Sequence, residues 1–153
     1  AAAVIAARAQ SRPLDTGRWS RCIATADTLA VPQVFFTDPE AASVGMTEQE
    51  ARAAGYRISV VDVAVGEAVM GAKLYADGYR GRARMVVDDS REVPLGVTMV
   101  GPGVGEILHS ATIAVAGEVP VDRLWHAVPC FPTVSELWLR LLEAYRDRQL
   151  SRS

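Results

Sequence analysis

Apolar residues alternate with polar ones in two neighbouring stretches, residues 82–88 and 95–100. Alternation with a period of two is typical of β-strands that have one buried face. The polar loop at residues 88–92 joins the two stretches, so they are predicted to form an antiparallel hairpin. Residues 56–65 are apolar at nearly every position and predict a strand buried on both faces, and residues 34–37 predict a further short strand.

The later part of the chain changes to the period of an α-helix. Residues 106–116 have one apolar face, and Gly117 ends the pattern. From residue 133 to about residue 148, apolar side chains recur three and four positions apart, as in an amphipathic helix. These side chains are Val134, Leu137, Trp138, Leu141, Leu142 and Tyr145. Strands that come first and helices that come last favour an α+β fold, with helices packed on an antiparallel sheet.

Two shorter helices and an irregular start complete the pattern. Residues 47–50 read TEQE, a capping box that starts a short helix, and residues 120–128 predict a short helix or turn. The alanine-rich residues 1–10 favour a helix, and residues 11–30 have little periodicity. The 153 residues therefore predict one main domain, residues 31–153, preceded by a helix and linker at residues 1–30.

Composition and charge exclude several classes of function. Half of the residues are apolar, and the net charge is −2 without a clustered basic excess. A nucleic-acid partner or a membrane surface would require such an excess, and no apolar run is long enough to span a bilayer. Cys22 and Cys130 are far apart and lie in no cysteine–histidine cluster, so we expect no metal site. Two cysteines make no disulfide framework either, which predicts a reduced, cytoplasmic protein.

The glycine-rich residues 101–105, with the sequence GPGVG, follow a predicted strand and open a helix. The third glycine of a dinucleotide-binding loop is replaced by Glu106, whose carboxylate would repel a pyrophosphate. We therefore expect no cofactor at this loop. His109 and His126 are general bases by residue type, but neither has a carboxylate at a catalytic spacing, and a structural role is predicted for both.

Residues 125–136, with the sequence WHAVPCFPTVSE, concentrate prolines, aromatic side chains, a thiol and a carboxylate in one turn. Thr133 and Glu136 have the spacing of a capping box that would start the last helix. Glu136 is therefore either a capping residue or a functional carboxylate. Cys130 is either a thiol activated by the following helix or an inert thiol buried among apolar neighbours, and the second reading is favoured.

Three segments in order along the chain resemble one known family. Residues 34–48 read VFFTDPEAASVGMTE, residues 100–107 read VGPGVGEI, and residues 131–136 read FPTVSE. Together they resemble the C-terminal dimerisation domain of the pyridine nucleotide-disulfide oxidoreductases, a family that includes dihydrolipoamide dehydrogenase and mercuric reductase. The resemblance extends from residue 31 to about residue 145. It implies that residues 1–30 are the residual helix and linker of a missing FAD-binding domain.

The resemblance also implies roles for the turn. In this family the domain forms a homodimer, and its last motif, His-Pro-Thr-x-x-Glu, reaches the flavin of the partner subunit. The histidine and glutamate of that motif act together in proton transfer. Glu136 matches the glutamate and is the candidate catalytic residue, whereas Phe131 stands in place of the histidine. Phe131 and Pro132 are the candidate residues that face the partner's cofactor.

A phenylalanine cannot transfer a proton, so the resemblance leads to an altered activity. We expect a full-length FAD-dependent NAD(P)H oxidoreductase that reduces a quinone or another non-disulfide acceptor. This chain alone should bind neither FAD nor NAD(P)H and should be inactive, because the hydride chemistry belongs to those cofactors. The alternative is a stand-alone homodimeric binding or scaffold module without redox activity.

Overall fold

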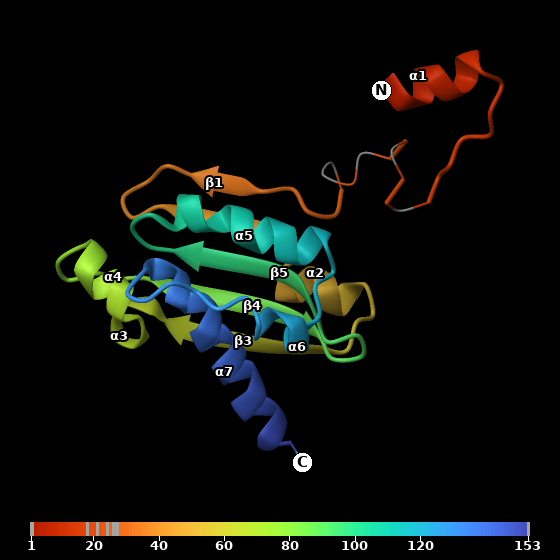
Figure 1. The fold of residues 1–153 in the computed structure, drawn as a ribbon. Coiled ribbons are helices and arrows are strands. Elements are labelled where there is room, and N and C mark those ends of the chain that lie inside the picture. The colour runs from red at the N-terminus through yellow and green to blue at the C-terminus, as the bar shows by residue number, and fades with distance from the viewer. Residues whose placement is uncertain (1, 18, 21, 24, 26–27, 153) are drawn as a thin grey trace.

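The computed structural model describes the whole chain except residues 1, 18, 21, 24, 26–27 and 153. In the described part, five strands form a single antiparallel sheet in the order β1-β2-β5-β4-β3 (Figure 1). The strands are β1 (Gln33–Phe35), β2 (Ala41–Gly45), β3 (Ile58–Ala64), β4 (Arg82–Asp88) and β5 (Val93–Val100). The predicted hairpin is β4 and β5, and the α+β class is confirmed.

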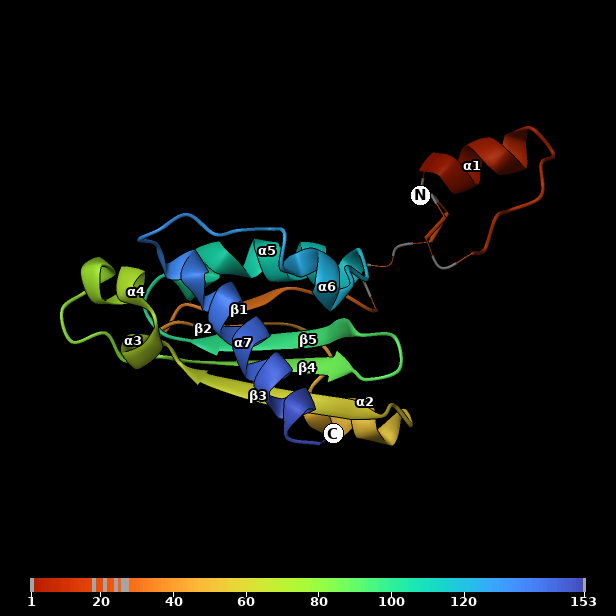
Figure 2. The same cartoon turned by 60° about the horizontal axis from the view of Figure 1, so that its bottom comes forward.

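Two long helices cover one face of this sheet. Helix α5 packs on β2 and β5, and helix α7 packs on β3 and β4 (Figures 1 and 2). Short helices connect the remaining elements. The helices are α1 (Ala2–Ala9), α2 (Glu48–Ala53), α3 (Val65–Ala68), α4 (Met70–Tyr75), α5 (Val104–Ala116), α6 (Val121–Leu124) and α7 (Leu137–Leu150), and a 3₁₀ turn occupies Val134–Glu136.

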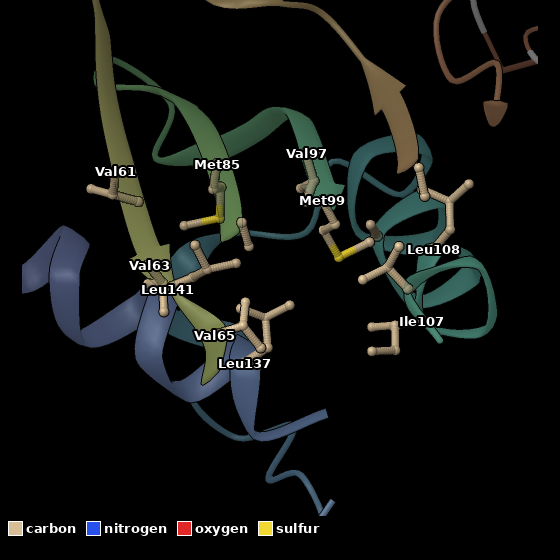
Figure 3. Packing of buried hydrophobic residues seen from close by; sticks show 14 of the residues in the cluster. Val61, Val63, Val65, Met85, Val97, Met99, Ile107, Leu108, Leu137 and Leu141 are labelled. Carbon is tan, nitrogen blue, oxygen red and sulfur yellow. The ribbon is translucent and has the colours of Figure 1, made fainter. Parts of the chain in front are cut away.

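The main core lies between the sheet and these two helices. Figure 3 shows Met85 and Met99 of the hairpin facing the same interior as Leu137 of α7 and Ile107 of α5. A smaller core lies on the opposite face, where Ala51 of α2 packs at one end of the sheet. Alternating side chains thus serve both cores, because successive residues of a strand point to opposite faces.

The middle of that opposite face is polar, whereas Phe35 and Val100 are exposed apolar residues at the end away from α2. Its middle row crosses all five strands through directly paired residues. The row consists of Gln33, Ser43, Thr98, Arg84 and Asp62. Arg84 Nε and Nη2 donate to the two carboxylate oxygens of Asp62 at 2.9 and 3.0 Å. This face therefore carries charge and hydrogen-bonding groups, unlike the helix-covered face.

Several elements differ from the sequence prediction. Strand β2 was not predicted, because its sequence AASVG is poor in β-forming residues. Helices α3 and α4 lie in what was expected to be an irregular connection. The alternation of β5 also shifts at a bulge opposite the Val86–Val87 step, which places Leu95 in the smaller core instead of beside Val97 and Met99.

Two methionines give a matched test of the core assignment. Met85 is fully buried between the sheet and helices, whereas Met70 is 46% exposed. Met85→Ala should lower the free energy of unfolding by about 2–5 kcal/mol, because it leaves a cavity, and Met70→Ala by less than about 0.5 kcal/mol. Urea unfolding followed by circular dichroism measures both. Equal losses in the two variants would contradict this core.

Candidate functional site

The turn that follows α6 runs along the helix layer to the start of α7, close to α4 (Figures 1 and 2). Its tip is not packed into the core. Phe131 is 74% exposed, and Val128 and Cys130 are also exposed. The Phe131–Pro132 peptide bond is cis. The turn therefore presents an aromatic ring at the surface, next to a well-anchored helix start.

The carboxylate of Glu136 anchors this helix start from inside the protein. Glu136 is only 4% exposed. Its Oε1 accepts the Thr133 N–H at 3.1 Å and the Gly71 N–H of α4 at 3.0 Å. The predicted capping box of Thr133 and Glu136 is thus present, although it opens a 3₁₀ turn before α7 begins at Leu137. The contact with Gly71 was not visible in the sequence, because it joins residues 65 positions apart.

The histidines and the thiol of this region lie at the surface. His109 and His126 are both exposed, and among the described residues neither is hydrogen-bonded to Glu136. The prediction of a buried Cys130 was wrong, because the residue is exposed. Thr133 Oγ1–H donates to the Cys130 carbonyl at 2.6 Å, which holds the backbone while the thiol stays outside the core.

The glycine-rich corner between β5 and α5 already holds a carboxylate of the protein. Glu40 Oε2 accepts the Gly105 N–H at 3.0 Å, and the Glu40 carbonyl accepts the Gly101 N–H at 2.9 Å. A carboxylate at the N-terminus of a helix satisfies a free N–H and the helix dipole. Glu40 therefore occupies the place that a pyrophosphate would need. Sequence reasoning had pointed to Glu106 instead, and that side chain is exposed.

Tyr79 fixes the same corner from the side. The Tyr79 hydroxyl donates to the Pro102 carbonyl at 2.9 Å, and the side chain is buried. Burial raises the pKa of Tyr79 to about 12, and the nearby Tyr75 and Glu40 add to this shift. Tyr79 is therefore a neutral donor in the folded protein over the whole range in which proteins usually function.

Two hollows flank the turn. One has a volume of about 380 Å³ and lies between α4, the start of α5 and the turn. Its apolar lining residues are Leu74, Tyr75, Ile107, Pro132 and Val134. The other is an apolar groove of about 370 Å³ between α5, α6 and α7, beside Ile113 and Trp138. Neither lining was predicted, because each combines residues from separate elements.

Among the residues that the structure describes, no group of three or more His, Cys, Asp or Glu side chains is placed to hold a metal ion. No described helix is long and apolar enough to cross a membrane.

Comparison with known proteins assigns the chain to a family. Residues 31–141 match the family model of the pyridine nucleotide-disulphide oxidoreductase dimerisation domain. The chain belongs to this family. The resemblance read from residues 34–48, 100–107 and 131–136 is thereby confirmed.

Individual relatives share this domain. The chain is 38% identical over 120 residues to a dihydrolipoyl dehydrogenase of Thermus scotoductus, covering 78% of this chain and 26% of that protein. It is 37% identical over 111 residues to the mitochondrial dihydrolipoyl dehydrogenase of Schizosaccharomyces pombe, covering 69% of this chain and 20% of that one. The chain thus spans about a quarter of the length of the first of these dehydrogenases.

Solved structures agree with the fold. The Escherichia coli HOCl-induced flavoprotein disulfide reductase RclA superposes with a TM-score of 0.71 at 28% identity, over 79% of this chain and 27% of that one. LpdA of Mycobacterium tuberculosis gives 0.69 at 20% identity and covers 95% of this chain and 28% of that one. The five-stranded sheet with its helices is therefore the architecture of this family's dimerisation domain.

The raised pKa of Tyr79 has a consequence for stability. In an unfolded chain a tyrosine ionises near pH 10. The stabilising contribution of the neutral Tyr79 is complete below that pH and is lost as the pH rises through about 12. The free energy of unfolding should therefore fall in this interval, and less so in Tyr79→Phe.

Tyr145 also has a raised pKa from burial, so the difference between the native chain and Tyr79→Phe isolates the part due to Tyr79. At neutral pH this variant should lose only one hydrogen bond, about 0.5–1.5 kcal/mol. Denaturant titrations from pH 9 to 12 give both results. If the free energy of unfolding fell equally with pH in the two proteins, the raised pKa would not belong to Tyr79.

Proposed function

We propose that this chain forms the homodimer interface of an FAD-dependent NAD(P)H oxidoreductase and supplies one wall of the partner subunit's flavin site. The observation that carries the proposal is the exposed edge formed by Phe131 and Pro132. These residues lie in the segment that resembles the family's last motif, and the buried Glu136 anchors that segment through the Thr133 N–H. The described residues fit a wall and not a complete cofactor site, since Glu40 fills the one helix N-terminus that resembles a dinucleotide loop. Hydride chemistry would come from the bound cofactors, and this chain alone is expected to be inactive.

The second subunit is proposed to dock on the helix side of the sheet. Ile113 and Val128 are exposed there, beside the apolar groove between α5, α6 and α7. Contiguous exposed apolar surface is typical of protein–protein interfaces. The opposite face carries the Arg84–Asp62 pair, whose burial would cost desolvation. The charged row therefore favours the helices as the dimer surface.

The acceptor is proposed to be a quinone or another molecule that needs no protein histidine for its reduction. Phe131 has no proton to transfer. Glu136 is already bound to two backbone N–H groups, and among the described residues neither histidine is bonded to it. An aromatic ring at the surface instead offers a flat apolar contact for a planar acceptor. We also propose a reducing, cytoplasmic location, which the two free thiols support.

The second candidate is a stand-alone homodimeric module without redox activity. The observation in its favour is that residues 31–153 contain a complete sheet with a core on each face. The two candidates differ in the longer polypeptide. Bound flavin would make a purified full-length protein yellow, and a colourless protein with the same dimer would favour the module.

The dimer surface is tested by a charge introduced at Ile113. Ile113→Asp should convert a dimer of twice 16.4 kDa into a monomer, because an aspartate cannot be buried in an apolar interface without a partner. Phe36→Asp is the control, since Phe36 is the more exposed residue and lies in the loop after β1, outside α5, α6 and α7. Sedimentation equilibrium measures the masses. Dissociation by both variants, or by neither, would contradict the proposed surface.

The acceptor is tested in the full-length enzyme. Positioned general acids and bases contribute roughly 10²–10⁴-fold to a rate, so without a histidine at position 131 the reduction of a disulfide such as lipoamide should be slowed by about that factor, whereas the reduction of a benzoquinone should not. Phe131→His should raise the disulfide rate and leave the quinone rate nearly unchanged. Stopped-flow oxidation of NAD(P)H follows both reactions. A native enzyme that reduces lipoamide as fast as the quinone would disprove the proposal.

A further inference from the structure

The short connection between α3 and α4 is held from two sides, by the 3₁₀ turn at Val134–Glu136 and by the first turn of α7. Glu136 Oε1 accepts the Gly71 N–H at 3.0 Å, at the beginning of α4. Arg140 Nε donates to the Ala68 carbonyl at 3.0 Å, at the end of α3. The two side chains lie four positions apart, and the two backbone groups lie three positions apart. The 3₁₀ turn and the first turn of α7 thus contact both ends of the α3–α4 connection.

The chemistry of the two contacts is complementary. A carboxylate group takes the free N–H of one helix start, and a guanidinium takes the free C=O of the preceding helix end. Arg140 is itself oriented, since its Nη1 lies 2.7 Å from Glu143 Oε2. Both backbone groups would otherwise lack the helical partners that interior residues have.

The approach of the two elements is closer than a side chain would allow. A Cβ atom at Gly71 would lie 2.0 Å from the Thr133 carbonyl carbon and 2.2 Å from its oxygen. Both are backbone atoms and cannot turn aside as a flexible side chain would. Gly71 is therefore the residue that lets α4 come within hydrogen-bonding distance of Glu136.

We propose that Glu136 and Arg140 form a two-point clamp that fixes the turn carrying Phe131 against α4, and that Gly71 is the positioning residue on which this clamp depends. The Glu136 carboxylate has no histidine to orient, and it connects α4 to the turn before α7. The 380 Å³ hollow between α4, α5 and the turn keeps its shape because the clamp sets the separation of its walls. Only the role of this hollow as part of a flavin site rests on the function proposed above.

Amide hydrogen exchange in the 153-residue chain tests the clamp directly. In Glu136→Ala the amides of Gly71 and Thr133 lose their acceptor and should exchange at least about 10-fold faster, while the amides of Met85 and Val97 in the sheet keep their rates. Glu136→Gln retains an acceptor oxygen and should preserve most of the protection. Arg140→Ala should raise exchange at Gly71 by a smaller factor, through the shared connection.

A pair of glycine variants separates local displacement from general destabilisation. Gly71→Ala should accelerate exchange at Thr133 without a matching change in the sheet. Gly55→Ala is the control, because Gly55 has φ +82° with nothing near its Cβ position. Gly55→Ala should destabilise the chain through backbone strain. The exchange rates of the Gly71 and Thr133 amides should then rise by the same factor as those of the sheet amides.

Unchanged protection in Glu136→Ala, or equal loss of protection in the alanine and glutamine variants, would overturn the clamp. The same experiment in an Ile113→Asp background separates this result from dimer formation. Protection at Gly71 and Thr133 that persists in a monomer supports the clamp even if the proposed homodimer is wrong. Protection that disappears in this folded monomer would assign it to the subunit interface and overturn the clamp.

Discussion

The buried oxygen of Glu136 constrains the arrangement of the whole candidate site. A carboxyl group that is 4% exposed has lost most of its contact with water, and an unmade hydrogen bond there would cost about 1–3 kcal/mol. Two backbone N–H groups, from Thr133 and Gly71, satisfy it. One of them sets the start of α7 and the other sets the position of α4. The exposed ring of Phe131 therefore lies two residues before a hydrogen-bonded helix start.

The two faces of the sheet differ in what they contact. Helices α5 and α7 bury one face and form the main core, and they carry the apolar groove and Ile113 on their outer side. The other face has α2 at one end and a charged row in its middle, where Arg84 and Asp62 pair across neighbouring strands. This asymmetry supports a second subunit on the helix side. It leaves the charged row suited to water or to a polar neighbour.

Sequence patterns predicted the parts of the fold that depend on local regularity. The alternation in β4 and β5, the capping box at Thr47 and the stripe along α7 each correspond to an observed element. The family resemblance located the turn and the substitution at Phe131. Strand β2 was missed because its stability comes from pairing between β1 and β5, which its own sequence does not reveal.

The site itself was less accessible from the sequence. Glu136 and Gly71, like Glu40 and Gly105, are 65 positions apart and meet only through the fold. The exposure of Cys130 depends on how the turn leaves the core, and apolar neighbours in the sequence gave the wrong answer. Local composition cannot report such contacts, because they arise when separate elements pack together.

We propose that the turn of one subunit contacts the flavin of the other. A crystal structure of the full-length homodimer with bound flavin tests it most directly. We expect Phe131 or Pro132 of one subunit within about 4.5 Å of the flavin of its partner, the separation at which apolar groups are in contact. A dimer in which both residues face solvent, or lie against their own subunit, would contradict the account.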